Sequence, residues 1–302
     1  MSRQRIVEDG RRRADGDDAR RRVLAGAPVT ERRLDLAGVS TAVLEGGDGP
    51  PVVLLHGQGG WSGMWLPVIP DLVTTHRVIA ADLPGLGASV VPDGPPDAAR
   101  VLAWLGELIQ RTCPAPPVLV GASLGASIAA RFAIAHPDRL SRLVLVGAGS
   151  LARFRPAPGV LLALIRFIAR PGERTQQGFL RQVAVDPAKV RALWGERWEA
   201  SQTYSLDRAR TPSVRAANRR MLRELGTRTI PPEELARIAV PTTLVWGRQD
   251  RVMRLRIAEQ ASTRYGWPLH VIEDAGHFAL EQPEACQRAL RAALGTPPEE
   301  RR

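Results

Sequence analysis

The chain has 302 residues, 44% of them hydrophobic, which is enough to bury one large core in a single domain. Its formal net charge is +11, yet the arginines alternate with acids, and neither aromatic interleaving nor zinc-ligand spacing accompanies them. We therefore expect no nucleic-acid partner. Cys113 and Cys286 stand far apart and outside any CxxC pattern, which argues against a disulfide framework and against a zinc site.

The N-terminal residues 1–27 are charged and lack hydrophobic periodicity, so they are predicted to form a disordered, arginine-rich leader. They contain no apolar core of a secretory signal. The richest apolar run, Val160 to Ile168, is interrupted by Arg166 and is too short to span a bilayer. We therefore expect a cytoplasmic protein without a membrane span, ending in a C-terminal tail over residues 296–302.

Eight strands are predicted after the leader. In chain order they are Thr30–Leu36, Thr41–Leu44, Val52–Leu55, Arg77–Ala81, Val118–Val120, Leu143–Val146, Thr242–Trp246 and Leu269–Ile272. Several are continuous apolar runs, and helical patterns separate most of the later ones, as is typical of strands covered on both faces. The pattern predicts an α/β fold with a mostly parallel, eight-stranded sheet covered by helices on both faces.

Residues 151–239, between the sixth and seventh predicted strands, contain only helical patterns. The expected helices are Val160–Ala169, Glu173–Val185, Lys189–Ser201 and Ser213–Leu225. We call residues 151–239 the cap segment. It would be inserted as a helical cap into a core formed by residues 28–150 and 240–295.

The pentapeptide GASLG, Gly121 to Gly125, lies between a predicted strand and a predicted helix. In that setting a GxSxG motif makes a sharp turn that exposes the serine at the carboxyl edge of the sheet. Ser123 is thus the candidate nucleophile, and the free N–H of Leu124 at the helix start would stabilise an oxyanion beside it. The alternative is a glycine-rich turn with a helix-capping serine.

A serine nucleophile needs a base, and the base needs an orienting acid. Asp250 follows the seventh predicted strand and His277 follows the eighth, so both belong to loops at the edge where open α/β sheets bind ligands. The order serine, acid, histidine is the one that accompanies a strand–turn–helix serine. Glu273 and Asp274 are rival acids, but at three or four residues before His277 they are better suited to shaping its loop.

A second glycine-rich turn, HGQGG at His56 to Gly60, follows the third predicted strand. Its composition is that of an oxyanion loop, in which the N–H of Gln58 would join that of Leu124. The alternative is a tight turn without a catalytic role.

The chain resembles the α/β-hydrolase superfamily from about Val29 to Leu294. The segments that carry the resemblance are VVLLHGQGG, ADLPGLGAS, GASLGAS, HPDRLSRLVLV, VPTTLVWGRQDRV and EDAGHFALEQPEA. It implies the α/β-hydrolase fold, the triad positions for Ser123, Asp250 and His277, and the oxyanion positions for Gln58 and Leu124. No metal or organic cofactor is implied.

Serine at the nucleophile position argues against the dehalogenases and epoxide hydrolases of the superfamily, which use aspartate. Hydrolysis of a carboxylic ester or similar acyl bond through an acyl-enzyme is then expected, with a small apolar substrate and a monomeric or homodimeric enzyme. The candidate substrate-binding residues are Trp61, Trp65, Leu161, Ile165, Trp194, Arg197, Trp198 and Phe278. Alternatively, most of them only pack the cap segment on the core.

Two other functions stay open. The segment GERWEASQ, Gly195 to Gln202, is similar to a cap segment of the carbon–carbon bond hydrolases of meta-ring-fission products, in which the arginine matching Arg197 helps to bind the dienoate. The chain departs from that family because its oxyanion loop lacks the GPGA continuation and because Phe278 stands where tryptophan is usual. The other possibility is a non-catalytic protein that binds a small molecule on the same fold.

Overall fold

A computed structural model describes residues 15–295 and contains one eight-stranded sheet. The strands are β1 (Thr30–Leu36), β2 (Val39–Gly46), β3 (Pro51–Leu55), β4 (Arg77–Ala81), β5 (Val118–Ala122), β6 (Arg142–Val146), β7 (Thr242–Gly247) and β8 (Leu269–Ile272). Their order is β1-β2-β4-β3-β5-β6-β7-β8, and only the β1–β2 and β2–β4 pairs are antiparallel. The predicted mostly parallel, eight-stranded sheet is confirmed.

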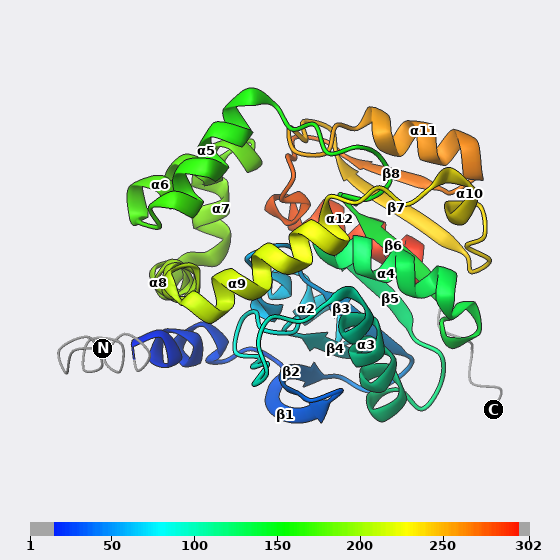
Figure 1. Cartoon of the computed structure of the whole chain (residues 1–302), viewed down its shortest axis with the longest axis horizontal. Helices are drawn as coiled ribbons and strands as arrows, with labels where there is room; N and C mark the ends of the chain where they lie inside the picture. The colour runs from blue at the N-terminus through cyan, green and yellow to red at the C-terminus, as the bar shows by residue number, and fades with distance from the viewer. Residues whose placement is uncertain (1–14, 296–302) are drawn as a thin grey trace.

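Helices cover both faces of this sheet, which explains why the central strands are apolar throughout (Figure 1). In β3, Val53 and Leu55 pack on the face covered by α3 (Ala98–Thr112), α4 (Leu124–Ala135) and α11 (Arg256–Tyr265). Val52 and Leu54 alternate onto the opposite face, which α2 (Ile69–Leu72) and α12 (Pro283–Leu294) cover. Each face therefore has its own apolar core.

The cap segment is helical. Between β6 and β7 the chain forms α5 (Pro158–Ala169), α6 (Glu173–Val183), α7 (Pro187–Trp194), α8 (Trp198–Arg210), α9 (Pro212–Met221) and α10 (Pro232–Leu235). Figure 1 shows α5 to α8 to one side of the strands, with α9 leading back to them. The single helix predicted over Lys189–Ser201 is wrong, because Gly195 adopts a φ of 51° and separates α7 from α8.

A helix also occupies residues 15–24, so the prediction of a disordered leader is wrong for that stretch. Ala19 and Val23 are fully buried in the same core as Leu44, one helical turn apart on one face. Two small apolar residues among many charges are too weak a periodic signal to recognise in the sequence. We call residues 15–24 the N-terminal helix; the rest of the predicted leader, residues 1–14, and the predicted tail, residues 296–302, lie outside the described residues.

Candidate active site

Ser123 lies in a tight turn between the end of β5 and the first residue of α4. Its φ of 51° is unfavourable for a residue with a side chain, and its N–H donates to the carbonyl of Val146 at 2.8 Å. Gly125 allows α4 to start this close to β3, because a Cβ there would lie 2.5 Å from the carbonyl oxygen of Leu55. The turn thus presents the Ser123 hydroxyl at the carboxyl edge of the sheet.

His277 and Asp250 reach the same edge from the loops after β8 and β7. Nε2 of His277 lies 3.1 Å from the Ser123 hydroxyl, and Nδ1 lies 2.8 Å from one oxygen of Asp250. The other oxygen of Asp250 accepts from the N–H groups of Val252 and Met253 at 2.7 and 2.8 Å. A continuous hydrogen-bonded chain therefore connects a fixed carboxylate, an imidazole and the serine.

The electrostatics of this chain favour a basic imidazole. Asp250 is buried, and the side chain of His277 is only 16% exposed. Burial alone would lower the pKa of His277, but the Asp250 carboxylate outweighs it and raises the pKa above its usual value. The carboxylate therefore increases the basicity of His277.

The rival acids are engaged elsewhere. Glu273 pairs with Arg248 at the surface, and this pairing lowers the pKa of Glu273. Asp274, at a φ of 51°, forms part of the turn before His277, and its carbonyl accepts from Gln282. Within the described residues, neither carboxylate hydrogen-bonds to His277.

The glycine-rich loop after β3 passes directly beside Ser123. A Cβ on Gly57 would lie 3.3 Å from the Cβ of Ser123, a tight contact that the glycine avoids. The N–H groups of Gln58 and Leu124 have no protein acceptor among the described residues. The neighbouring N–H of Gly59 donates to the side chain of Asn218, on α9, at 3.2 Å. Asn218 was not predicted, because nothing in its local sequence indicates that α9 returns to this loop.

A cavity of about 360 Å³ opens from Ser123 and His277 toward the cap segment. Its walls are mostly apolar, and they include Trp61, Trp194, Trp198 and Phe278 as predicted, together with Val160, Leu164 and Phe167 of α5. The polar side chains besides Ser123 and His277 are Gln58, Gln176, Ser201, Gln202, Ser205 and Asn218. None of the described residues that line it is Arg, Lys, Asp or Glu.

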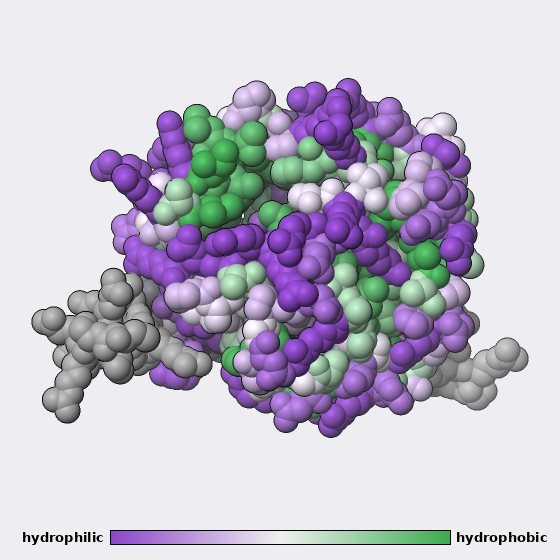
Figure 2. Space-filling view, viewed as in Figure 1, coloured by the Kyte–Doolittle hydropathy of each residue, from purple (hydrophilic) through white to green (hydrophobic). Residues whose placement is uncertain are grey.

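Four predicted pocket residues lie outside this cavity. Trp65 is fully buried in the core. Leu161 and Ile165 are 44% and 54% exposed on the outer side of α5. Figure 2 shows hydrophobic surface over the part of the cap segment where Figure 1 places α5. Arg197 donates to the carbonyl of Ala25, just after the N-terminal helix, at 2.9 Å. The hydrophobic pattern of α5 runs around the helix, so the sequence alone did not indicate which side chains face inward.

Glu281 supports the histidine loop and was not predicted. Its buried carboxylate accepts from the N–H of Gly276, next to His277, and from those of Val185 and Asp186 after α6. Burial raises the pKa of Glu281 although these N–H groups act in the opposite direction. The residue thus joins the loop of His277 to the cap segment.

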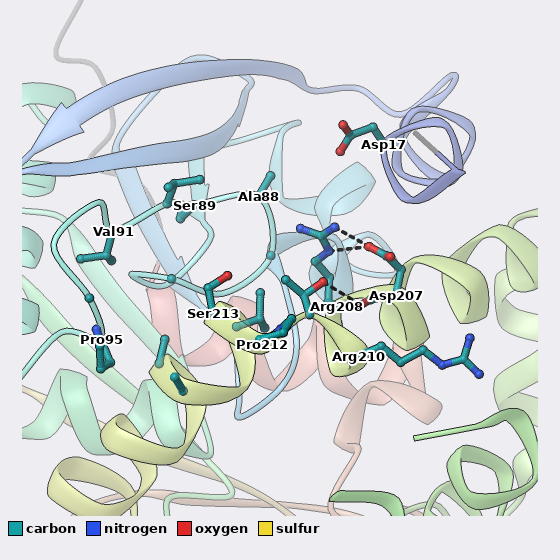
Figure 3. A pocket seen from close by; sticks show the side chains of 18 of the residues that line it. Asp17, Ala88, Ser89, Val91, Pro95, Asp207, Arg208, Arg210, Pro212 and Ser213 are labelled. Carbon is teal, nitrogen blue, oxygen red and sulfur yellow. Dashed lines mark hydrogen bonds and ion pairs between the residues drawn. The ribbon is translucent and has the colours of Figure 1, made fainter. Parts of the chain in front are cut away.

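A second cavity, of about 380 Å³, lies between the N-terminal helix, the loop after β4 and the α8–α9 junction (Figure 3). Its charged lining residues carry both signs: Asp17, Arg33, Asp207, Arg208 and Arg210. Arg208 is paired with Asp207, and none of the described residues that line the cavity is a histidine that could activate its serines. Within residues 15–295, no group of three or more His, Cys, Asp and Glu is placed to hold a metal ion. The first cavity is therefore the candidate active site.

Comparison with known proteins agrees with this geometry. The family model of the alpha/beta hydrolase fold matches residues 50–284. The chain is 29% identical over 278 residues, 87% of its length and 90% of the relative's, to a 2-hydroxy-6-oxo-6-(2'-aminophenyl)hexa-2,4-dienoic acid hydrolase of Metapseudomonas resinovorans. It is 30% identical over 251 residues, 79% of its length and 92% of the relative's, to a pimeloyl-[acyl-carrier protein] methyl ester esterase of Aeromonas hydrophila subsp. hydrophila.

Among solved structures, the carboxylesterase CesB of Bacillus subtilis superposes with a TM-score of 0.78 at 22% identity, covering 95% of this chain and 98% of that one. The likeness extends over the whole described fold. The sheet order, the serine turn and the match over residues 50–284 lead to one conclusion. The chain belongs to the α/β-hydrolase fold family and is a hydrolase.

Proposed function

We propose that this hydrolase cleaves a carboxylic ester or similar acyl bond of a small, uncharged and largely apolar substrate. One observation carries the proposal: the hydrogen-bonded chain of Ser123, His277 and Asp250 ends in a cavity whose described lining residues include no acid, lysine or arginine. A charged substrate group would lose its hydration there without gaining a partner.

The geometry supports acyl transfer in two steps. His277 takes the proton of Ser123 at Nε2 while the serine oxygen attacks the carbonyl carbon, and Asp250 stabilises the resulting imidazolium. The N–H groups of Gln58 and Leu124 would hold the oxyanion. His277 then protonates the leaving alcohol, and a water that it activates hydrolyses the acyl-enzyme.

Carbon–carbon hydrolysis of a ring-fission product is the second candidate, because the relative in M. resinovorans is named for such a dienoic acid. That substrate carries a carboxylate, which calls for a cation in the site. Arg197, which would match the dienoate-binding arginine, does not line the cavity and instead donates to the carbonyl of Ala25. We therefore rank ester hydrolysis first.

The test is a panel of p-nitrophenyl esters of increasing acyl length, assayed beside a synthetic ring-fission product. We expect ester turnover that depends on Ser123, with Ser123→Ala as the control. Turnover of the dienoate alone would overturn the ranking. Labelling with a fluorophosphonate separates both enzymes from a non-catalytic binding protein, which would form no adduct dependent on Ser123.

A further inference from the structure

The N-terminal helix places a buried arginine beside the candidate active site. Arg20 is only 4% exposed, in contrast to its neighbours Arg21 and Arg22, which extend into solvent and pair with Asp18. The Arg20 guanidinium bonds to Glu31 on β1 at 3.0 Å, to Asp82 after β4 at 2.9 Å and to the Tyr204 hydroxyl on α8 at 2.9 Å. One side chain thus joins the N-terminal helix, the sheet and the cap segment.

Asp82 connects Arg20 to Ser62, two residues after the oxyanion loop of residues 56–60. One of its oxygens accepts from the N–H of Ser62 at 2.6 Å, and the other accepts from the N–H of Ala88 at 2.7 Å. Burial alone would raise the pKa of Asp82, but Arg20, His56 and the two N–H groups together outweigh it and lower the pKa, so the carboxylate stays ionised. Ser62 directly follows Trp61, which lines the active-site cavity.

Trp61 itself is packed between aromatic and cationic groups. The Arg20 guanidinium lies 4.5 Å from the centre of the Trp61 ring, within cation–π distance. The Tyr204 ring meets Trp61 edge-on at 4.7 Å. On the same helix as Tyr204, Ser201 and Ser205 line the cavity, so the position of α8 determines part of its wall.

The N-terminal helix contacts α8 at a second point as well. A Cβ on Gly16 would lie 2.5 Å from the carboxylate of Asp207, so the backbone there approaches α8 closely. Figure 3 shows Asp17 of the N-terminal helix across the second cavity from Asp207 and Arg208. Together with Arg20, this contact places the N-terminal helix against the outer side of α8.

We propose that Arg20 is a positioning residue for the active site. It fixes the position of Trp61, and of the oxyanion loop that precedes Trp61, relative to α8. This inference rests on the proposed serine hydrolysis. Its physical basis is that Arg20 binds Asp82, Trp61 and Tyr204 at once, so its removal frees the loop and the cavity wall together. Small displacements of groups that hold the reacting carbonyl cost large factors in rate.

The decisive comparison is Arg20→Lys with Arg21→Lys as the matched control. Lysine keeps the charge but lacks the planar fork that reaches three partners and stacks on Trp61. We expect Arg20→Lys to lower kcat for p-nitrophenyl esters about tenfold per active site, counted with a fluorophosphonate, and to raise KM more for long than for short acyl chains. Arg21→Lys should stay within about twofold of wild type on both constants, since its exposed pair contributes little.

A purely structural role for Arg20 would give a different result. It would lower the unfolding temperature while leaving kcat and KM per labelled site unchanged, and that result overturns the inference. Tyr204→Phe provides a second variant that leaves Arg20, Glu31 and Asp82 in place. It should lower kcat in the same direction but less, and unchanged kinetics in this variant also count against the inference if Arg20→Lys does not fold.

The wild-type arm separates the two proposals. If wild-type protein is neither labelled by the fluorophosphonate nor active on any ester, the proposed function fails and the role of Arg20 fails with it. If wild type is labelled and active while both variants match it, only the role of Arg20 is refuted.

Discussion

The sheet and the cap segment contribute to the active site in different ways. The sheet edge supplies Ser123, Asp250 and His277, all joined by hydrogen bonds of 3.1 Å or less. The cap segment supplies mostly apolar walls and carries most of the net charge, +9 of +11, with 17 basic and 8 acidic residues between positions 151 and 239. Those charges lie away from the cavity lining. Chemistry therefore depends on backbone loops at strand ends, and specificity depends on which face of each cap helix turns inward.

The largest expected effect is on the sheet side of this comparison. Ser123→Ala removes the nucleophile and should lower kcat on the order of 10⁶-fold, as losses of such a serine do elsewhere. The matched control is Ser213→Ala, in the second cavity, which should remain within about twofold because no histidine is among the described residues that line that cavity. Steady-state ester hydrolysis measures both. Equal losses in the two variants would mean that the wrong cavity has been chosen.

The second-largest effect is expected from replacing Asp250, the acid that contacts His277. Asp250→Asn should lower kcat about 10³–10⁴-fold, because the imidazolium then loses its carboxylate. In wild type, activity should fall as pH drops through the pKa of His277, and Asp250 raises that pKa, so the acid limb lies above pH ~6.5.

In Asp250→Asn the carboxylate no longer raises the pKa of His277, and burial still lowers it. The acid limb of the residual activity should therefore move to lower pH. A pH–kcat profile of both proteins measures the shift. An unchanged acid limb in Asp250→Asn would show that a group other than His277 controls the fall of activity at low pH.

Glu281→Gln tests the junction between the two regions. A neutral amide offers one acceptor oxygen where the carboxylate accepts from Gly276, Val185 and Asp186, so the loop of His277 should loosen. We expect kcat to fall about tenfold with a smaller change in KM. Glu284→Gln, at an exposed position on α12, is the control and should be neutral. Equal kinetics for the two variants would show that Glu281 does not support the loop of His277.

The smallest effect tests the faces of α5. Leu164→Ser, on the inner face, should raise KM for long acyl esters about fivefold, because it removes apolar contact with the chain. Leu161→Ser, on the outer face, should leave KM within about twofold. If Leu161→Ser has the larger effect on KM, α5 is rotated relative to the cavity when substrate binds.

Much of the core was predictable from local patterns. Short runs of β-forming residues predicted all eight strands, and the residues that follow β5, β7 and β8 predicted Ser123, Asp250 and His277 as candidate site residues. Strands in a parallel sheet end at one edge, so the order of elements along the chain was enough to bring these side chains together. The glycines of the serine turn were equally local signals, since a side chain at Gly121 or Gly125 would collide with backbone.

Only the tertiary structure decided the rest of the site. Arg20, Asn218 and Glu281 act on segments far from them in the chain, and no local pattern distinguishes a buried charge from a solvated one. The same limit applies to Leu161 and Leu164, which are identical residues three positions apart on one apolar helix: Leu161 is 44% exposed, and Leu164 lines the cavity. Sequence periodicity determines that a helix has an apolar face, but the partner across the interface determines which side chains meet the substrate.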